Sequence, residues 1–488
     1  MTLAMETAAA DTAGARARLL SIGFDEAGVR ARLGLKDLND ITGKALPIYR
    51  SERLRDRDPL ACAIELFVLQ GSLSVIEADA LLASPDQKSL FRAGILERHG
   101  DSIHALASLY PVGRRLIFAD HAWPQLGHGA GSIVPHDRVM YVGTDSRWLA
   151  RTTFRKLVKD ALDLCCGSGI HALLAAFHSE TATAVDINPR AVQYTAFNAR
   201  GLGVSNVQAL CGDLYAPVTG RLFDLVTANP PFVPAPAQEI GFRDGGPSGE
   251  DVLRRIVEGL PAHLAKGGTA QIVTEFGERE GETLMSRVRA WLRDTRMNVH
   301  VLRLRVHSAQ TYAIAHASGD DPEAILASVG RWSKNLADHG YVRVVSVLLA
   351  FQWSDDPWSR EDEALPPARD AAHEWEAIFA AESLSRDPAL KDRLKAGRVA
   401  RTTPIALTET RGLGVHLPAV MQARALGPAI AVEHGLDPIE RDILSCMEDA
   451  IATTELLSAA AKASVPEAAV IEGLVALVRK GLIQLEGR

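Results

Sequence analysis

The chain has 488 residues, too many for one ordinary hydrophobic core, so its length predicts about two to four domains. Hydrophobic residues make up 47% and charged residues 23% of the chain, as is ordinary for a soluble globular protein. The formal net charge of −7 argues against a surface that binds phosphate backbone throughout, although it leaves room for a local basic patch.

Cysteine usage indicates a reducing compartment. The five cysteines are an odd number, none has zinc-ligand spacing, and the N-terminus shows no apolar signal segment, so we expect reduced thiols in a cytoplasmic protein. The histidine spacings fit no ligand motif, and we expect no metal site. No run of about 18 apolar residues occurs, so we expect no membrane span.

The predicted elements divide the chain into five parts. In chain order these are an N-terminal helical segment at 1–45, a winged-helix-like domain at 46–110, a central domain at 111–353 with its core at 157–318, a linker and mixed region at 354–430, and a second winged-helix-like domain at 431–488. Neither winged-helix-like part has a dense Lys/Arg recognition helix. We therefore interpret both as packing or protein-contact domains, with nucleic-acid binding as the alternative.

Strand and helix patterns alternate in the central domain, which predicts an α/β fold with a Rossmann-like, mostly parallel sheet. Seven strands are expected, at 161–165, 183–186, 207–210, 223–228, 269–275, 298–306 and 311–316. The short connection at 307–310 predicts that the last two strands pair antiparallel. The apolar run at 341–353 joins or extends the sheet.

Polar motifs follow four consecutive strands of this sheet. They are Asp163-Leu-Cys165-Cys-Gly167-Ser-Gly169, then Asp186, then Asp213-Leu214, then Asn229-Pro230-Pro231-Phe232. Taken singly, a tight turn or a helix cap explains each of them. Because open α/β sheets bind ligands at the carboxyl ends of their strands, we expect the set to form one site.

The chemistry of these strand ends favours a nucleoside cofactor beside an amino acceptor. An acid at 186 is placed to accept ribose hydroxyls, and Asp213 followed by Leu214 suits an adenine amino group and ring face. Two prolines stiffen the backbone of the NPPF motif (Asn229–Phe232), which presents an amide carbonyl, backbone carbonyls and one ring. That arrangement suits a flat –NH₂ group.

The four motifs resemble those of class I S-adenosylmethionine-dependent methyltransferases. The NPPF motif resembles the amino-methyltransferase branch, which includes HemK-like release-factor glutamine methyltransferases and ribosomal RNA guanine and adenine N-methyltransferases. Further matches to the HemK-like pattern are Gly245, Gly246, Gly249, Leu253 and Lys266-Gly-Gly268, and the resemblance covers residues 110–318. Two departures stand out: Cys165 replaces the first glycine of the first motif, and Phe232 is more usual in the RNA guanine enzymes.

The resemblance implies S-adenosylmethionine as cofactor and a role for each motif. Its implied cofactor contacts are Asp163, Cys165, Gly167 and Gly169 at the methionine moiety, Asp186 at the ribose, Ile187, Asp213 and Leu214 at the adenine, and also Asn229. The implied catalytic residues are Asn229, Pro230 and Phe232. Asn229 and the Pro230 carbonyl orient the acceptor nitrogen and Phe232 holds its plane, so that methyl transfer needs no strong base.

Three functions remain open from the sequence. The acidic balance favours an N-methyltransferase acting on a planar amide, guanidino or amino nitrogen of a protein glutamine or a small metabolite. The alternative is a base N-methyltransferase of rRNA, tRNA or DNA, and the third is a non-catalytic binding module, supported by Cys165 alone. Glu239, Arg243 and Asp244 are candidates for reading the acceptor, and the sequence does not predict an oligomeric state.

Overall fold

The computed structural model describes residues 12–121, 137–237, 240–410, 420–426, 428–447 and 449–486. Its contacts divide the chain into two compact units. The first comprises Met1–Ala150 and Lys156–Arg360, and the second comprises Arg151–Arg155 and Glu361–Arg488. None of the described helices is both long and apolar enough to cross a bilayer.

The N-terminal part of the first unit is a helical module with two small sheets. Its main elements are α1 (Ala13–Ser21), α2 (Glu26–Leu33), α3 (Leu46–Ile48), α4 (Pro59–Phe67), β1 (Ser72–Ser74), α5 (Val75–Leu81), α6 (Ser84–Arg92), β2 (Leu96–His99), β3 (Ser102–Ala105), β4 (Ser108–Val112) and β5 (Arg115–Ala119). The antiparallel sheet has the order β1-β3-β2, and β4 pairs with β5. The identification of this part as a winged helix stays a prediction.

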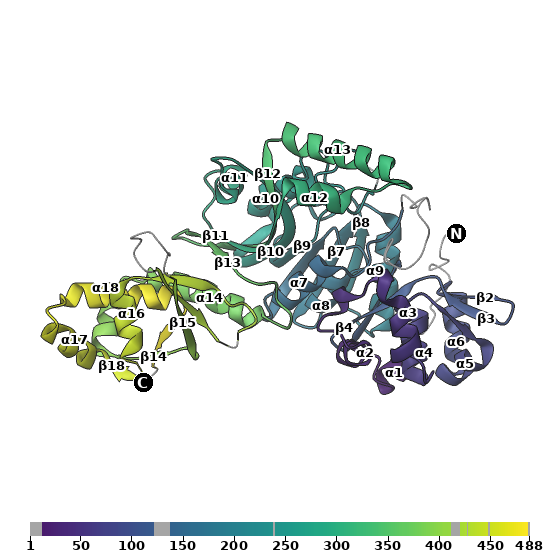
Figure 1. Cartoon of the computed structure of the whole chain (residues 1–488), viewed down its shortest axis with the longest axis horizontal. Helices are drawn as coiled ribbons and strands as arrows, with labels where there is room; N and C mark the ends of the chain where they lie inside the picture. The colour runs from purple at the N-terminus through teal and green to yellow at the C-terminus, as the bar shows by residue number, and fades with distance from the viewer. Residues whose placement is uncertain are drawn as a thin grey trace. The chain divides into compact units, whose positions relative to one another are not determined.

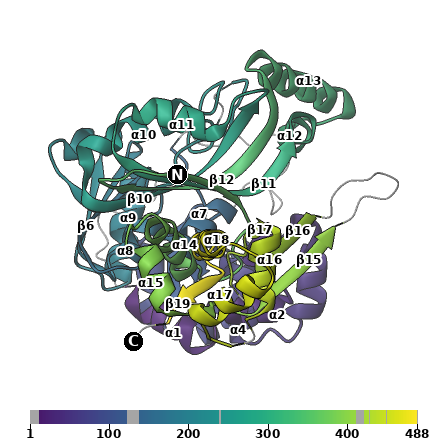
Figure 2. The same cartoon turned by 90° about the vertical axis from the view of Figure 1, so that its left-hand side faces the viewer.

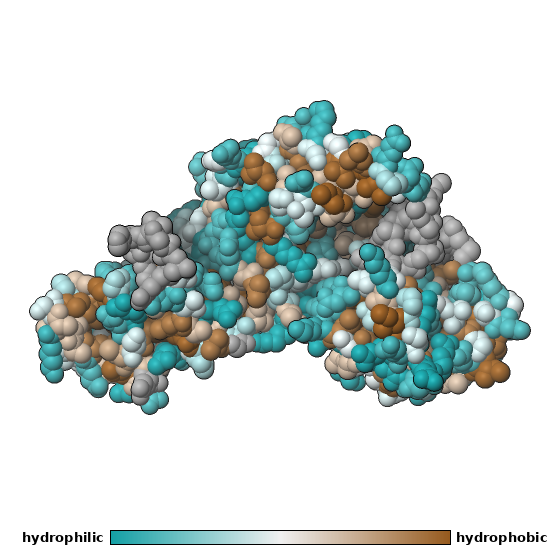
Figure 3. Space-filling model, viewed as in Figure 1, coloured by the Kyte–Doolittle hydropathy of each residue, from teal (hydrophilic) through white to brown (hydrophobic). Residues whose placement is uncertain are grey.

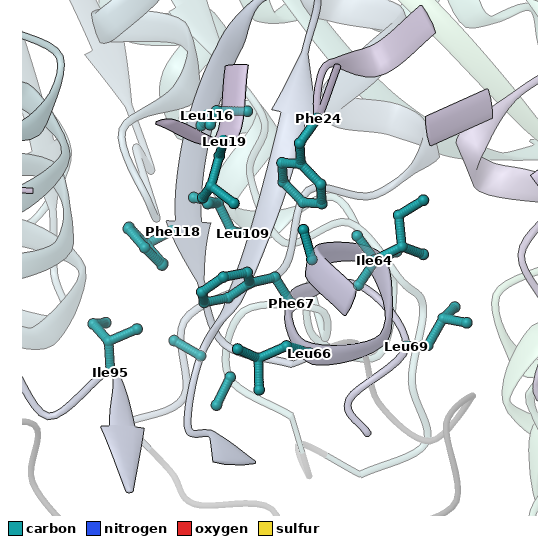
Figure 4. Close-up of a cluster of buried hydrophobic side chains, with 14 of the residues drawn as sticks. Leu19, Phe24, Ile64, Leu66, Phe67, Leu69, Ile95, Leu109, Leu116 and Phe118 are labelled. Carbon is teal, nitrogen blue, oxygen red and sulfur yellow. The ribbon is translucent and has the colours of Figure 1, made fainter. Parts of the chain in front are cut away.

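One hydrophobic core joins α1 and α2 to the rest of this module. Figure 4 shows Phe67 of α4 between Phe24 and Phe118, with ring centroids 6.4 Å and 6.3 Å away in edge-to-face geometry. Such aromatic pairs add to the stabilisation from burial alone. Residues on both sides of position 45 therefore share one core.

The central sheet of the first unit confirms the predicted α/β, Rossmann-like fold. Its strands are β6 (Val158–Leu164), β7 (Ser179–Asp186), β8 (Val207–Cys211), β9 (Phe223–Ala228), β10 (Leu264–Arg279), β11 (Met297–Ser308), β12 (Tyr341–Trp353) and β13 (Ser359–Glu363). Their order is β13-β11-β12-β10-β9-β6-β7-β8. Strands β6 to β10 are parallel, and β12 is antiparallel to both neighbours. Six of the seven predicted strands are present, the run at 341–353 joins the sheet as β12, and β13 lies at the edge.

The predicted strand at 311–316 is wrong, because Ala309–His316 forms helix α12. Ser308 caps this helix by accepting a hydrogen bond from the Thr311 N–H at 3.1 Å. Such a cap, together with an alanine-rich turn, overrides the β-propensity of Thr311 and Tyr312. The antiparallel partner of β11 is instead β12, and the sheet extends well beyond residue 318.

Helices α12 and α13 (Pro322–Asp338) form an insertion between β11 and β12. This insertion leaves large apolar side chains in solvent, including Ile314 at 58% and Leu326 at 72% exposure. Figure 3 shows apolar side chains gathered over these two helices. The insertion therefore presents an apolar surface next to the strands that close the sheet.

Helices cover both faces of the central sheet (Figures 1 and 2). Alternate residues of each strand point to opposite faces. Leu162 and Val226 pack with α10 (Asp251–His263) and α11 (Leu284–Leu292). Ala161 and Leu225 pack with α8 (Ile170–Ala175) on the other face, where α7 (Thr144–Thr152) and α9 (Pro189–Gly201) also lie. The helices cover the faces of the sheet, so a ligand site is expected at the carboxyl ends of its parallel strands.

The second unit has its own core, centred on the buried side chains Leu474 and Leu477 of α18 (Glu467–Arg479). The stretch predicted as a linker and mixed region contributes α14 (Ala372–Ser385), α15 (Leu390–Ala396), β14 (Arg398–Arg401), β15 (Ile405–Thr410) and β16 (Val420–Ala425). The remaining elements are β17 (Glu433–Leu436), α16 (Pro438–Ser445), β18 (Ile451–Ala452), α17 (Thr453–Lys462) and β19 (Ile483–Leu485). Two antiparallel sheets have the orders β18-β14-β19 and β15-β16-β17. The winged-helix-like identification stays a prediction here as well.

Candidate active site

A cavity of about 350 Å³ lies at the carboxyl ends of β6 to β9. This volume is within the range of small-molecule sites. The cavity brings together most of the residues singled out from the sequence, namely Cys165, Gly167, Asp186, Ile187, Asp213, Leu214 and Asn229. Four others lie outside its lining: Asp163, Gly169, Pro230 and Phe232.

Asp186 shapes the loop that follows β6. Its two carboxylate oxygens accept hydrogen bonds from the Gly167 N–H at 2.9 Å and the Asn188 N–H at 2.8 Å. Burial raises the pKa of Asp186, while these backbone donors oppose the shift. Cys165 has a φ of +56° and Gly167 a φ of +53°, so the loop turns its backbone towards the cavity in a left-handed conformation.

Asp163 lies beneath this loop and is 1% exposed. It accepts hydrogen bonds from the Ala172 N–H and the Thr227 hydroxyl, both at 3.0 Å. Burial raises the pKa of Asp163 to about 7. Gly169 also supports the loop from behind, because a Cβ there would lie 2.7 Å from the Thr195 side chain. Both residues tie β6, α8, α9 and β9 together rather than facing the cavity.

Asp213 pairs with Arg255 of α10, a residue that the sequence did not single out. The guanidinium donates to the Asp213 carboxylate at 2.7 Å, and both side chains are about half exposed. The two residues line the cavity with Leu214. Ile187 lies at the cavity with 71% of its surface exposed, so its side chain is open to a ligand ring.

The Asn229 amide at the end of β9 is held by the first turn of α7. Its Nδ2 donates to the Asp145 carboxylate and to the Ser146 hydroxyl, both at 3.0 Å. Burial raises the pKa of Asp145, and the hydrogen bond from Asn229 opposes this shift. Neither Asp145 nor Ser146 was predicted from the sequence as a site residue. The available signal was an Asp-Ser pair at a helix start, which indicates a cap rather than a site.

The backbone of the NPPF motif is covered by the loop at 240–249. The N–H groups of Phe232 and Val233 donate to the Arg243 carbonyl at 3.1 Å and 3.0 Å. A Cβ at Gly249, whose φ is +76°, would lie 2.4 Å from the Phe232 carbonyl oxygen. A Cβ at Gly245 would lie 2.7 Å from the Pro231 carbonyl oxygen. Close approach of two backbones explains both glycines.

Phe232 packs with the hydrophobic cluster of Val233, Tyr312 and Trp332, beside α12 and α13. Its predicted contact with the acceptor stays a prediction. Asp244 is 1% exposed and accepts from the Arg243 Nε and the Ile240 N–H, each at 2.7 Å, so it shapes the loop internally. Glu239 lies outside the described residues.

The N-terminal module anchors one wall of the cavity, the segment at 138–142. Asp120, which follows β5, accepts from the Val139 N–H at 2.8 Å and from the Tyr194 hydroxyl at 2.7 Å. Asn198 of α9 donates to the Ser168 carbonyl of the β6 loop at 3.0 Å and also bonds to β5. The module is thereby tied to both the wall and the loop.

Comparison with known proteins agrees with this geometry. The model of the methyltransferase small domain family matches residues 141–292, and that of a domain of unknown function (DUF7059) matches residues 21–106. A putative protein N5-glutamine methyltransferase from Methanocaldococcus jannaschii is 33% identical over 156 residues, which are 30% of this chain and 78% of that protein. The chain belongs to the HemK-like branch of the class I S-adenosylmethionine-dependent methyltransferases.

Two further relatives of this chain are longer than the matched region. A ribosomal protein uL3 glutamine methyltransferase from Bradyrhizobium diazoefficiens is 40% identical over 134 residues, which are 25% of this chain and 41% of that protein. A release factor glutamine methyltransferase from Moorella thermoacetica is 35% identical over 141 residues, which are 26% of this chain and 49% of that protein. The chain spans less than half the length of these two relatives.

The methyl donor of this family is S-adenosylmethionine, and the cavity of this chain fits it. Two carboxylates, Asp186 and Asp213, lie at the ends of neighbouring strands. Carboxylates at these positions can accept hydrogen bonds from ribose hydroxyls and from an adenine amino group. The loop at 165–167 presents backbone without a bulky side chain, and a Cβ on Gly167 is 4.0 Å from the nearest atom, Val139. Leu214 and Ile187 add the apolar surface that a purine ring needs.

Proposed function

We propose that this protein transfers the methyl group of S-adenosylmethionine to the side-chain amide nitrogen of a glutamine in a protein. The observation that supports this most strongly is the Asn229 amide at the cavity, whose –NH₂ group donates hydrogen bonds to Asp145 and Ser146. Its carbonyl oxygen is thereby left to accept a hydrogen bond from the –NH₂ group of an acceptor. The names of the relatives agree with a glutamine acceptor.

On the cofactor side, we assign Asp186 to the ribose hydroxyls and Asp213 to the adenine amino group. Each Asp186 oxygen already accepts one backbone N–H and keeps a second lone pair for a hydroxyl. Ile187 and Leu214 pack on the adenine ring, and the backbone at 165–167 receives the methionine moiety. The bound cofactor supplies an electrophilic methyl group on a sulfonium.

On the acceptor side, the protein must orient a poor nucleophile, because the lone pair of an amide nitrogen is delocalised. We assign the Asn229 Oδ1 and the Pro230 carbonyl to accept the two acceptor N–H groups. These hydrogen bonds strengthen as positive charge develops on the nitrogen, so they favour the transition state over the ground state. Positioning in line with the methyl group then supplies most of the rate. The nitrogen returns to neutral by losing one of its two N–H protons to solvent, which needs no strong base because methylation makes that proton acidic.

Surface chemistry supports a protein acceptor over a nucleic acid. The chain carries a net charge of −7, whereas a phosphate backbone attracts a basic surface. Exposed apolar side chains such as Ile314 and Leu326 on α12 and α13 are typical of protein contacts. All five cysteines, each within the described residues, are free thiols, which fits a reducing cytoplasm.

Transfer of a labelled methyl group into a fractionated cell extract tests this function. The purified protein is incubated with labelled S-adenosylmethionine and an extract from cells that lack it, and the products are treated with protease or nuclease. We expect the label in protein with the wild type and its absence with Asn229→Ala. Label in nucleic acid or in small molecules would contradict the glutamine assignment.

A further inference from the structure

The partners of Asn229 decide which end of its amide faces the acceptor. The oxygen and the –NH₂ group of an asparagine side chain are similar in size, so packing alone does not distinguish the two orientations. Only their hydrogen-bond polarity differs. In this structure Nδ2 faces the start of α7, where it meets Asp145 Oδ2 and Ser146 Oγ, each at 3.0 Å.

Of these two partners, only Asp145 enforces the orientation. Asp145 Oδ2 accepts the hydrogen bond from Asn229 Nδ2, and this hydrogen bond favours the ionised carboxylate against the effect of burial. An ionised carboxylate can accept a hydrogen bond and cannot donate one, so it accommodates the –NH₂ group and repels the carbonyl. A serine hydroxyl donates or accepts equally well and adapts to either orientation. The carboxylate therefore sets the polarity, and Ser146, which is 5% exposed, follows it.

A reversed amide would be incompatible with methyl transfer to an amide nitrogen. With Nδ2 turned towards the acceptor, two –NH₂ groups would face each other, and only the Pro230 carbonyl would be left to accept from the acceptor nitrogen. The acceptor would lose its orientation while the cofactor contacts at β6 to β8 stayed intact. A reversed Asn229 amide should therefore impair the orientation of the acceptor and not the binding of the cofactor.

We propose that Asp145 is a positioning residue for the methyl transfer, which acts by fixing the Asn229 amide with its carbonyl towards the acceptor. This inference rests on the proposed function above. Asp145 does not line the cavity, whereas Asn229 does, so its effect on the acceptor passes through Asn229. The first turn of α7 thus belongs to the catalytic site, although it lies 84 positions before Asn229 in the chain.

Substitution of Asp145 by asparagine tests the proposal with the least change in shape. The new amide can present either its oxygen or its –NH₂ group, so it no longer enforces one orientation of Asn229. We expect kcat to fall about 10- to 100-fold, the size of a lost hydrogen bond to a charged group, with an unchanged Kd for S-adenosylmethionine. Ser146→Ala keeps the carboxylate and should lose less activity. An equal loss in Ser146→Ala, or full activity in Asp145→Asn, would overturn the proposal.

A double-mutant cycle separates positioning from a general structural effect. If Asp145 acts only through Asn229, then adding Asp145→Asn to Asn229→Ala should cause no further loss of the residual kcat. A further loss of about tenfold in that background would show a separate role and contradict the proposal. Thermal unfolding of all variants checks that they remain folded.

A measurement on the free protein distinguishes this proposal from the proposed function. In nitrogen-labelled protein, the side-chain –NH₂ signals of Asn229 are assigned by their loss in Asn229→Ala. We expect slow hydrogen exchange of these signals in the wild type and faster exchange in Asp145→Asn. Unchanged exchange would overturn the positioning role even if the enzyme is active. If exchange is slow in the wild type and faster in Asp145→Asn, but no methylglutamine is formed, the proposed function alone would be contradicted.

Discussion

The two halves of the cavity are built from different kinds of connection. In the cofactor half, Asp186 and Asp213 stand at the ends of adjacent parallel strands, and Asp186 holds the β6 loop through backbone N–H groups. In the acceptor half, the Asn229 amide is held by side chains of α7, and the NPPF backbone by a loop that follows it. The first half depends on sheet topology, whereas the second depends on tertiary contacts between distant segments.

This difference predicts that variants in the two halves separate binding from turnover. A change in the cofactor half should weaken binding of S-adenosylmethionine. A change in the acceptor half should leave that affinity intact and lower the rate. Substitutions in each half can therefore be compared by their effects on cofactor affinity and on turnover.

The largest expected effect is that of Asn229→Ala in the acceptor half. Removal of the amide should lower kcat by about 100- to 1,000-fold, because a preorganised polar contact to the reacting group is lost. Calorimetry should find the Kd for S-adenosylmethionine within a factor of about three of the wild type. Full activity in this variant would exclude the role assigned to Asn229.

In the cofactor half, Asp186→Ala should raise the Kd for S-adenosylmethionine by about 10- to 100-fold. The variant loses the proposed ribose contacts and also the two acceptors for the Gly167 and Asn188 N–H groups. Asp186→Asn is the matched control, since it keeps one acceptor and should bind more tightly than the alanine variant. A Kd equal to that of the wild type in Asp186→Ala would refute the assignment.

Gly249→Ala should lower turnover by about tenfold and leave cofactor affinity unchanged, because it pushes the 240–249 loop away from the NPPF backbone. Its Cβ would lie 2.4 Å from the Phe232 carbonyl oxygen. Gly267→Ala is the matched control: its φ of +79° imposes similar backbone strain, but its Cβ has no described atom within 4 Å. Equal turnover in the two variants would show that strain, rather than the close approach, is responsible.

A last effect concerns stability rather than binding or turnover, and it is a pH dependence that comes from Asp163. Burial raises the pKa of Asp163 to about 7 in the folded protein, whereas an unfolded aspartate titrates near about 4. The folded state therefore binds the proton more tightly, and stability should fall as pH rises from about 4 to about 7. Asp163→Asn should show a smaller fall in the unfolding temperature across that range. A profile identical to that of the wild type would contradict this assignment.

Much of the cofactor half could be predicted from the sequence. Parallel strands place their carboxyl ends at one edge, so Asp186, Asp213 and Asn229 were expected to converge without knowledge of any long-range contact. The roles of Asp163 and Gly169 were not predicted, because whether a loop residue faces the ligand or the protein depends on how α8 and α9 pack behind it.

The acceptor half could be predicted only in part. The rigidity of the NPPF motif follows from its prolines, but Asp145 reaches Asn229 only through the packing of α7 on the sheet. Arg255 likewise meets Asp213 across 42 positions. The misassigned segment at 311–316 shows the same limit, since the cap at Ser308 outweighed the local β-propensity.

Methyl transfer to a glutamine side chain is tested most directly by the identity of the methylated atom. Protein labelled in the extract is digested, and each labelled peptide is sequenced by mass spectrometry. We expect N5-methylglutamine with the wild-type enzyme and at least about 100-fold less with Asn229→Ala. A methyl group on any other side chain, or on a nucleic-acid base, would contradict it.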